Sequence, residues 1–285
     1  MDVPVQRVMR PQSLAEALVL LGEAQEARPI AGGTDLMVQL RDGRRRAETL
    51  VDLGGLNLSG IRELDLGVEI GAGTTMDAIA RHPLLRRRWP GLAEAAGLVG
   101  AWPIQCRATL GGNLANASPA ADTVPPLLVA DAVVRLASPT GEREVALDGF
   151  FRGPGATVMA PGDLIVGVLL PAPSAGRVVE QFVKVGPRRE QIISMVSLAG
   201  RAAVDETGVL RDVRVALGAV APTPVRARRV EAFLEGRRPD AAARREAAVR
   251  LQADIAPIDD VRASAGYRRI TAAVLLDRFL EACNA

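Results

Sequence analysis

The sequence has few of the side chains from which metal and nucleophile sites are built: it contains only two cysteines and one histidine. An iron–sulfur cluster normally takes four cysteine or histidine ligands, so this chain cannot hold one alone. A catalytic zinc site with two or three histidines is excluded for the same reason. His82 precedes Pro83 at a predicted helix end, and we interpret it as a surface residue. Cys106 and Cys283 are far apart in sequence, so no disulfide framework is expected.

Excess charge and long apolar runs are also missing. The formal net charge of +2 is too small to indicate binding to nucleic acid or to a membrane surface. We interpret the arginine runs 44–46 and 86–88 as solvated surface or partner contacts, because no aromatic platform lies beside them. No apolar run approaches the ~18 residues that span a bilayer, and the first residues lack a signal-peptide pattern. We therefore expect a cytoplasmic chain with no membrane span.

The length of 285 residues predicts about two domains. The segment from Pro171 to Gly176, Pro-Ala-Pro-Ser-Ala-Gly, is the strongest candidate for a linker. We therefore divide the chain into domains over residues 1–173 and 177–285.

Hydrophobic periodicity predicts a mixed first domain. Ser13 and Glu16 form a capping-box pattern ahead of a helix. Hairpins are expected over 61–73 and 132–147, further strands over 28–31, 49–53 and 164–170, and helices over 14–21, 36–40, 75–80 and 91–99. Residues 103–126 fit no regular element, because glycine, alanine, asparagine, serine and proline dominate them.

The second domain has a different texture. Long strands are predicted over 178–185, 193–204 and 209–220, and helices follow over 225–234, 240–253 and 264–283. Strands first and helices later predict an α+β fold.

Two glycine-bearing loops are candidates for ligand binding. Ala31-Gly32-Gly33-Thr34-Asp35 follows a strand directly, and its backbone N–H groups can form a nest for an anion. Taken alone, this pattern is also typical of an ordinary tight turn. The second loop, residues 109–122, combines small residues with Asn113, Ser118 and the carboxylate of Asp122, which can accept from ligand hydroxyls. A purely structural loop is the alternative.

A third glycine motif, Gly71-Ala72-Gly73-Thr74-Thr75-Met76, imitates the dinucleotide fingerprint of Rossmann folds. Met76 stands where the third glycine belongs, and the preceding sequence predicts a hairpin. We therefore do not interpret this motif as a nucleotide site.

The two loops together resemble the paired FAD loops of the xanthine dehydrogenase family, which includes the medium subunit of aerobic carbon monoxide dehydrogenase. The motifs are Ala31-Gly32-Gly33-Thr34-Asp35 and Thr109-Leu110-Gly111-Gly112-Asn113 with Ala117-Ser118-Pro119 and Asp122. The segment from Lys184 to Glu190, Lys-Val-Gly-Pro-Arg-Arg-Glu, is similar to a further family motif, and the resemblance extends over the whole chain.

This resemblance implies a two-lobed FAD-binding domain of the vanillyl-alcohol oxidase type, with lobes over about 1–54 and 55–173, and a smaller α+β C-terminal domain. Residues 31–35 and 109–113 would hold the FAD pyrophosphate through their backbone, Asp122 would bind ribitol or ribose hydroxyls, and Ile165 would contact the rings. Lys184, the only lysine, would place a positive charge near the flavin. The implied cofactor-binding residues are Ile30, Ala31, Gly32, Gly33, Thr34, Asp35, Leu36, Ala101, Thr109, Gly111, Gly112, Asn113, Ala117, Ser118, Asp122, Ile165 and Lys184, with no catalytic residue and no metal ligand.

The resemblance also implies a division of labour. A large partner subunit would hold the molybdenum cofactor, and a small partner would carry two [2Fe–2S] clusters. This chain would pass electrons through FAD to NAD or a quinone within an (αβγ)2 heterohexamer. A self-contained flavin oxidase and a scaffold that has lost FAD are the alternatives. Aromatic residues are only 3% of the chain, so the stacking partners that some relatives place against the flavin are mostly missing, although Trp102 could reach that region.

Overall fold

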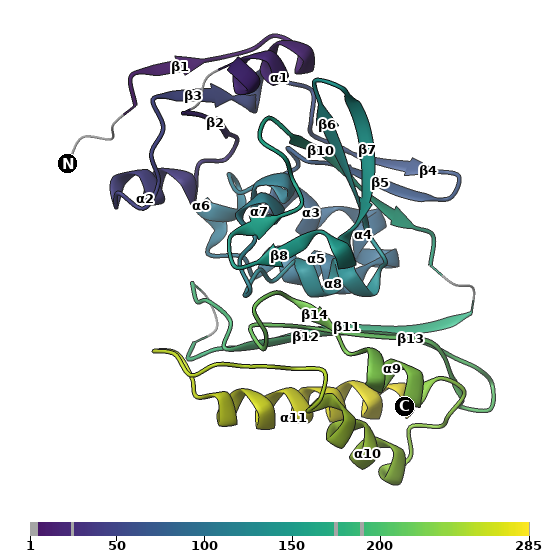
Figure 1. The fold of residues 1–285 in the computed structure, drawn as a ribbon. Helices are drawn as coiled ribbons and strands as arrows, with labels where there is room; N and C mark the ends of the chain where they lie inside the picture. Colours follow the sequence, from purple (N-terminus) through teal and green to yellow (C-terminus); the bar gives the residue numbers. More distant parts are fainter. Residues whose placement is uncertain (1–4, 24–25, 174–175, 189–190, 285) are drawn as a thin grey trace.

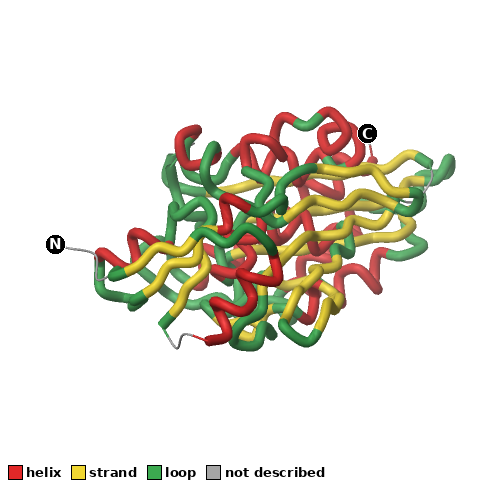
Figure 2. Tube along the Cα trace, turned by 90° about the horizontal axis from the view of Figure 1, so that it is seen from above, coloured by secondary structure: helices red, strands yellow, loops and turns green. Residues whose placement is uncertain are grey.

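The computed structural model describes residues 5–23, 26–173, 176–188 and 191–284. Its three main β-sheets follow one another along the chain, and helices lie between and below them (Figure 1). Seen from above, the short strands beside the N-terminus form a group separate from the longer strands at the far end of the molecule (Figure 2). The α+β fold, with a two-lobed domain ahead of a smaller one, is as predicted.

The N-terminal lobe is a parallel sheet with two helices. Strands β1 (Arg7–Met9) and β2 (Ala27–Ile30) flank β3 (Thr49–Asp52). Helix α1 (Leu14–Glu23) buries Ala17 and Leu18, and Ser13 accepts from the N–H of Glu16 at 3.1 Å, as the capping pattern predicts. Five residues, 31–35, separate the end of β2 from helix α2 (Leu36–Arg41).

The second lobe is an antiparallel sheet covered on one face by short helices. Its strands, in spatial order, are β4 (Ile61–Leu64), β5 (Gly67–Gly71), β10 (Leu164–Pro171), β6 (Val133–Ser138) and β7 (Gly141–Ala146). The two predicted hairpins are thus confirmed. The covering helices are α3 (Met76–Arg81), α4 (Pro83–Arg88), α5 (Pro90–Gly97) and α8 (Val124–Val129), and a small ribbon of β8 (Phe151–Gly153) and β9 (Ala156–Thr157) lies apart from the sheet.

The prediction that residues 103–126 contain no regular element is wrong. Helices α6 (Trp102–Gln105) and α7 (Leu110–Asn116) lie there, and α8 begins at Val124. Thr109 caps α7 by accepting from the N–H of Gly112, and all six residues of α8 are buried. Such short helices owe their stability to tertiary packing, which helix propensity does not report.

The C-terminal domain is an antiparallel sheet with its own helices on one face, and helices α5 and α8 of the second lobe contact the sheet from the other side (Figure 1). Its strands are β11 (Arg177–Val185), β12 (Val196–Val204), β13 (Leu210–Gly218) and β14 (Val225–Arg226), and its helices are α9 (Arg228–Leu234), α10 (Ala241–Leu251) and α11 (Ala265–Asn284). The predicted helix over 225–234 is therefore wrong at its start, where Val225 pairs with β13. A Cβ at Gly200 would lie 2.5 Å from the ring of Phe279, so the glycine lets α11 pack directly on β12.

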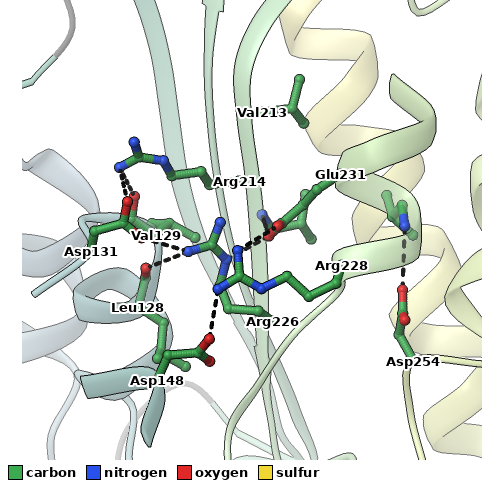
Figure 3. A network of polar contacts seen from close by, with 12 residues as sticks. Leu128, Val129, Asp131, Asp148, Val213, Arg214, Arg226, Arg228, Glu231 and Asp254 are labelled. Carbon is green, nitrogen blue, oxygen red and sulfur yellow. Dashed lines mark hydrogen bonds and ion pairs between the residues drawn. The ribbon is translucent and has the colours of Figure 1, made fainter. Parts of the chain in front are cut away.

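Arginines join the two domains (Figure 3). Arg226 donates to the carbonyl oxygen of Leu128 at 3.0 Å and to Asp131 at 2.7 Å, and it pairs with Glu231 at 2.5 Å. Arg228 pairs with Asp148 at 2.6 Å. Arg226 therefore adds a charged donor at the C-terminal end of α8, and the two arginines fix the C-terminal domain against the second lobe.

Candidate functional site

The two glycine-bearing loops line one cleft of about 1390 Å³. Residues 191–193, between β11 and β12, line it as well, so both domains contribute to its wall. Typical small-molecule sites measure roughly 300–1,000 Å³. The cleft is therefore large enough for a ligand of dinucleotide size.

The first loop offers unpaired backbone donors. Gly33 has a φ of +72°, in the region that favours glycine. A Cβ at Gly32 would lie 1.9 Å from the carbonyl oxygen of Arg107, so only glycine fits there. Among the described residues, the N–H groups of residues 32–35 donate to no protein acceptor. Consecutive free N–H groups in such a turn can bind a phosphate group.

The backbone of the second loop is held internally. The N–H of Leu110 donates to Thr74 at 3.0 Å and that of Gly111 to Ala72 at 2.8 Å, while Gly112 and Asn113 both donate to Thr109 at 3.0–3.1 Å. The segment 71–76, which imitates the Rossmann fingerprint, thus supplies the carbonyl oxygens that accept from the first N–H groups of α7. The N–H groups of residues 110–113 already have acceptors within the chain. Of the two loops predicted to hold a pyrophosphate through their backbone, the first therefore has the free N–H donors.

The second loop contributes exposed backbone at Gly112 and the side chain of Asn113 to the cleft wall. A Cβ at Gly112 would meet only the hydroxyl of Thr109, at 3.0 Å, so this stretch of backbone is open to a ligand. Asn113 accepts from Thr123 at 2.6 Å, which fixes its amide and leaves the amide nitrogen without a described partner. Gln39, from the first lobe, donates to Asn116 at 3.2 Å and ties α2 to α7.

Asp122 lies on the cleft wall and is held by two residues of the C-terminal domain. Its Oδ2 pairs with Lys184 Nζ at 2.6 Å, and its Oδ1 accepts from the hydroxyl of Ser194 at 2.5 Å. Lys184 also donates to the carbonyl oxygen of Leu98 at 3.1 Å. Burial raises the pKa of Asp122, and the contacts with Lys184 and Ser194 oppose that rise.

Comparison with known proteins identifies the family. Residues 4–173 match the model of the FAD binding domain in molybdopterin dehydrogenase, and residues 181–283 match that of the CO dehydrogenase flavoprotein C-terminal domain. The chain is an FAD-binding subunit of the molybdenum hydroxylase family. It is thus an oxidoreductase subunit, as the paired loops predict.

Several relatives of this FAD-binding subunit match along nearly their whole length. The xanthine dehydrogenase FAD-binding subunit of Escherichia coli is 31% identical over 91% of this chain and 89% of its own. The carbon monoxide dehydrogenase medium chain of Afipia carboxidovorans is 32% identical, over 97% and 96%. The solved structure of reconstituted CO dehydrogenase from Oligotropha carboxidovorans superposes with a TM-score of 0.95 at 30% identity, over 100% of this chain and 99% of that one.

The structure places most predicted cofactor-binding residues of the FAD-binding subunit on the cleft wall. These are Ile30, Ala31, Gly32, Gly33, Thr34, Asp35, Leu36, Ala101, Thr109, Gly112, Asn113, Ser118 and Asp122. Arg189 and Glu190, of the predicted Lys184–Glu190 motif, lie outside the described residues.

Four predicted residues do not line the cleft. Gly111 packs on Ala72, and Ala117 ends α7 with a φ of +48°. Ile165 lies in the core on β10, only 6% exposed, because the strand turns its side chain toward the covering helices. The side chain of Lys184 is 4% exposed and lies behind Asp122, since a buried ammonium needs a carboxylate partner. The positive charge that the resemblance implies near the flavin is thus paired with the Asp122 carboxylate in this structure.

Sequence reasoning missed other parts of the wall. Arg45, from a run interpreted as solvated surface or a partner contact, is half-buried and lines the cleft with Arg28. Neither arginine has an ion pair among the described residues. Ser194 carried no local signal, because only the β11–β12 pairing brings it near Asp122. No helix in the described part of the chain is long and apolar enough to cross a membrane.

Proposed function

We propose that this chain holds FAD in the cleft and passes electrons from [2Fe–2S] clusters of a small partner subunit to NAD or a quinone. A molybdenum cofactor on a large partner subunit oxidises the organic substrate. The bound FAD supplies the redox chemistry, and this chain supplies binding, orientation and shielding.

One observation carries the proposal: every carboxylate among the described wall residues already accepts a hydrogen bond or an ion pair from another side chain of this chain. These carboxylates are Asp35, Asp122 and Asp163. Asp35 accepts from Gln39, Asp122 is held by Lys184, and Asp163 pairs with Arg143 at 2.8 Å. A self-contained oxidase needs a group that takes a proton from its substrate, so this arrangement favours an electron carrier.

The wall fits FAD in two chemically different regions. The free N–H groups of the first loop and the cations Arg28 and Arg45 suit the pyrophosphate. An apolar stretch suits the flavin rings, and it is formed by Val99, Ala101, Pro103, Ile104, Ile192 and Ile193. The N–H of Gln191 donates to the carbonyl oxygen of Gly100 at 3.2 Å, which joins the two halves of this apolar stretch.

We further propose that the subunit works in an (αβγ)2 assembly in the cytoplasm. The high coverage of a carbon monoxide dehydrogenase medium chain supports the partner types. Size-exclusion chromatography of the co-expressed operon products tests this assembly. The three chains are expected to elute together. If this chain elutes at the same volume with and without its partners, the proposed assembly is contradicted.

The electron path is tested by anaerobic mixing. We expect NADH or a quinol to bleach the flavin of the full-length chain by the reverse reaction, and whichever succeeds identifies the acceptor. Candidate organic substrates, xanthine and carbon monoxide among them, are expected to bleach it only when the partner subunits are present. Bleaching of the isolated chain by an organic substrate would instead support the self-contained oxidase.

A further inference from the structure

The Asp122 carboxylate is fixed from behind by a different domain from its own. Asp122 lies between α7 and α8 in the second lobe, whereas Lys184 is on β11 and Ser194 is two residues ahead of β12. The side chain of Lys184 is 4% exposed, and Ser194 is 1% exposed. Asp122 lines the cleft, and neither of its two partners is among the described wall residues.

The carboxylate of Asp122 still has acceptor capacity. An ionised carboxylate has about four lone-pair sites, two on each oxygen. Lys184 occupies one site on Oδ2 and Ser194 occupies one on Oδ1. Each oxygen therefore keeps one site, and two acceptors on one carboxylate match two neighbouring hydroxyl groups.

We propose that Lys184 and Ser194 are positioning residues, which hold Asp122 ready for a pair of adjacent hydroxyls on a sugar chain of the flavin nucleotide. The proposal rests on the proposed function, because it requires FAD in the cleft. It differs from the role that the resemblance implies for Lys184: the ammonium acts through Asp122 and does not touch the flavin. The C-terminal domain thereby completes a binding site that lies mostly in the first domain.

Several contacts explain why this arrangement is rigid. Lys184 also donates to Leu98 at 3.1 Å, in the segment that leads to the apolar part of the wall. Met195, next to Ser194, donates through its N–H to Val185 at 2.9 Å. Rotation of the Asp122 carboxylate would therefore break buried hydrogen bonds, one of them to the charged ammonium of Lys184.

A double-mutant cycle on the full-length chain, stripped of FAD and titrated with it, tests the proposal. Ser194→Ala and Lys184→Met are each expected to weaken FAD binding about tenfold or more, as loss of a hydrogen bond to a charged group does. In an Asp122→Asn background, each effect is expected to shrink to within about twofold. A Lys184→Met effect that persists undiminished in that background would mean direct contact and would overturn the proposal.

Ser194→Ala keeps the test independent of folding, because it removes one hydroxyl and leaves the ion pair in place. Ser138→Ala is the control, since Ser138 is the last residue of β6 and lies outside the cleft wall, and it is expected to leave FAD affinity unchanged. If Ser194→Ala binds FAD like the wild type, the proposal fails. If the wild type itself binds no FAD, it is the proposed function that fails.

FMN and ADP separate the two possible sugars. FMN carries the ribityl hydroxyls and ADP carries ribose hydroxyls, so the nucleotide whose affinity falls in Ser194→Ala identifies which sugar Asp122 binds. Unchanged binding of both nucleotides would overturn the proposal.

Discussion

Gly32 and Arg107 meet where the two lobes of the FAD-binding domain come together. A side chain at position 32 would begin 1.9 Å from the carbonyl oxygen of Arg107, closer than any two such atoms can lie. The first loop therefore approaches the backbone just ahead of the second loop without any intervening side chain. This contact sets how closely the two loops can lie on either side of a ligand.

Gly32→Ala is accordingly expected to push the loops apart. We expect a loss of stability on the order of 1–3 kcal/mol, typical of overpacking, together with loss of bound FAD. Thermal unfolding measures the loss of stability, and the flavin content of the purified protein measures the loss of FAD. Gly149→Ala is the control, because a Cβ there meets nothing within 4 Å. Full flavin content in Gly32→Ala would contradict the proposed loop geometry.

Gly112→Ala separates binding from folding. The new Cβ would meet only Thr109 in the protein, at 3.0 Å, and alanine favours a helix over glycine by roughly 1 kcal/mol. The apoprotein is therefore expected to keep its stability, while the methyl group blocks close approach of FAD. Isothermal titration of the apoprotein measures the loss, and unchanged FAD affinity would show that the ligand does not approach this backbone.

Asn113→Ala is expected to reduce FAD retention without unfolding the chain. The variant removes the cleft-facing amide and leaves Thr123 without one hydrogen bond, which costs about 1 kcal/mol. Flavin content after extensive dialysis checks the prediction. A variant that retains flavin like the wild type would assign Asn113 a structural role only.

Arg226→Met is expected to weaken the attachment between the domains. The side chain of Arg226 is 4% exposed and contacts Leu128, Asp131 and Glu231, so its removal takes a cationic partner from the buried carboxylate of Glu231 and breaks the link to Leu128 and Asp131. Breaking a buried ion pair costs about 3–5 kcal/mol. Denaturant unfolding measures this. Arg229→Met, at a side chain 65% exposed, is the control and is expected to change stability by less than about 1 kcal/mol.

The two thiols are expected to react very differently. Cys106 is exposed, whereas burial raises the pKa of the Cys283 thiol to about 12. At pH 8 a disulfide reagent should therefore modify one thiol quickly in the native chain and both after denaturation. Cys106→Ser should abolish the fast reaction. Fast modification of Cys283 in the native state would contradict its burial on α11.

Local patterns predicted the parts of the fold that are determined locally. The hairpins around Asp65 and Thr140 follow from turn residues between alternating strands, and Ser13 marks the start of α1. Both glycine-bearing loops could be located because each contains two adjacent glycines, which let the backbone approach a ligand closely. Helix α7 could not be found in the same way, because its glycines disfavour a helix and its stability comes from packing on Ala72 and Thr74.

The contacts that complete the site are long-range and left no trace in local sequence. Lys184 and Asp122 are 62 residues apart, and Ser194 and Asp122 are 72 apart. The prediction for Lys184 did not include Asp122 as its partner, because sequence alone does not show that this carboxylate lies beside the ammonium. The sequence also does not show that Ile165 lies in the core, because an apolar strand residue can face a ligand or the core.

The central claim is tested most directly by identifying what the chain carries. The full-length protein is purified with and without its partner subunits and denatured, and the released flavin is identified by chromatography. The account predicts FAD near one per chain in the co-purified sample. The absence of flavin from both preparations would contradict it.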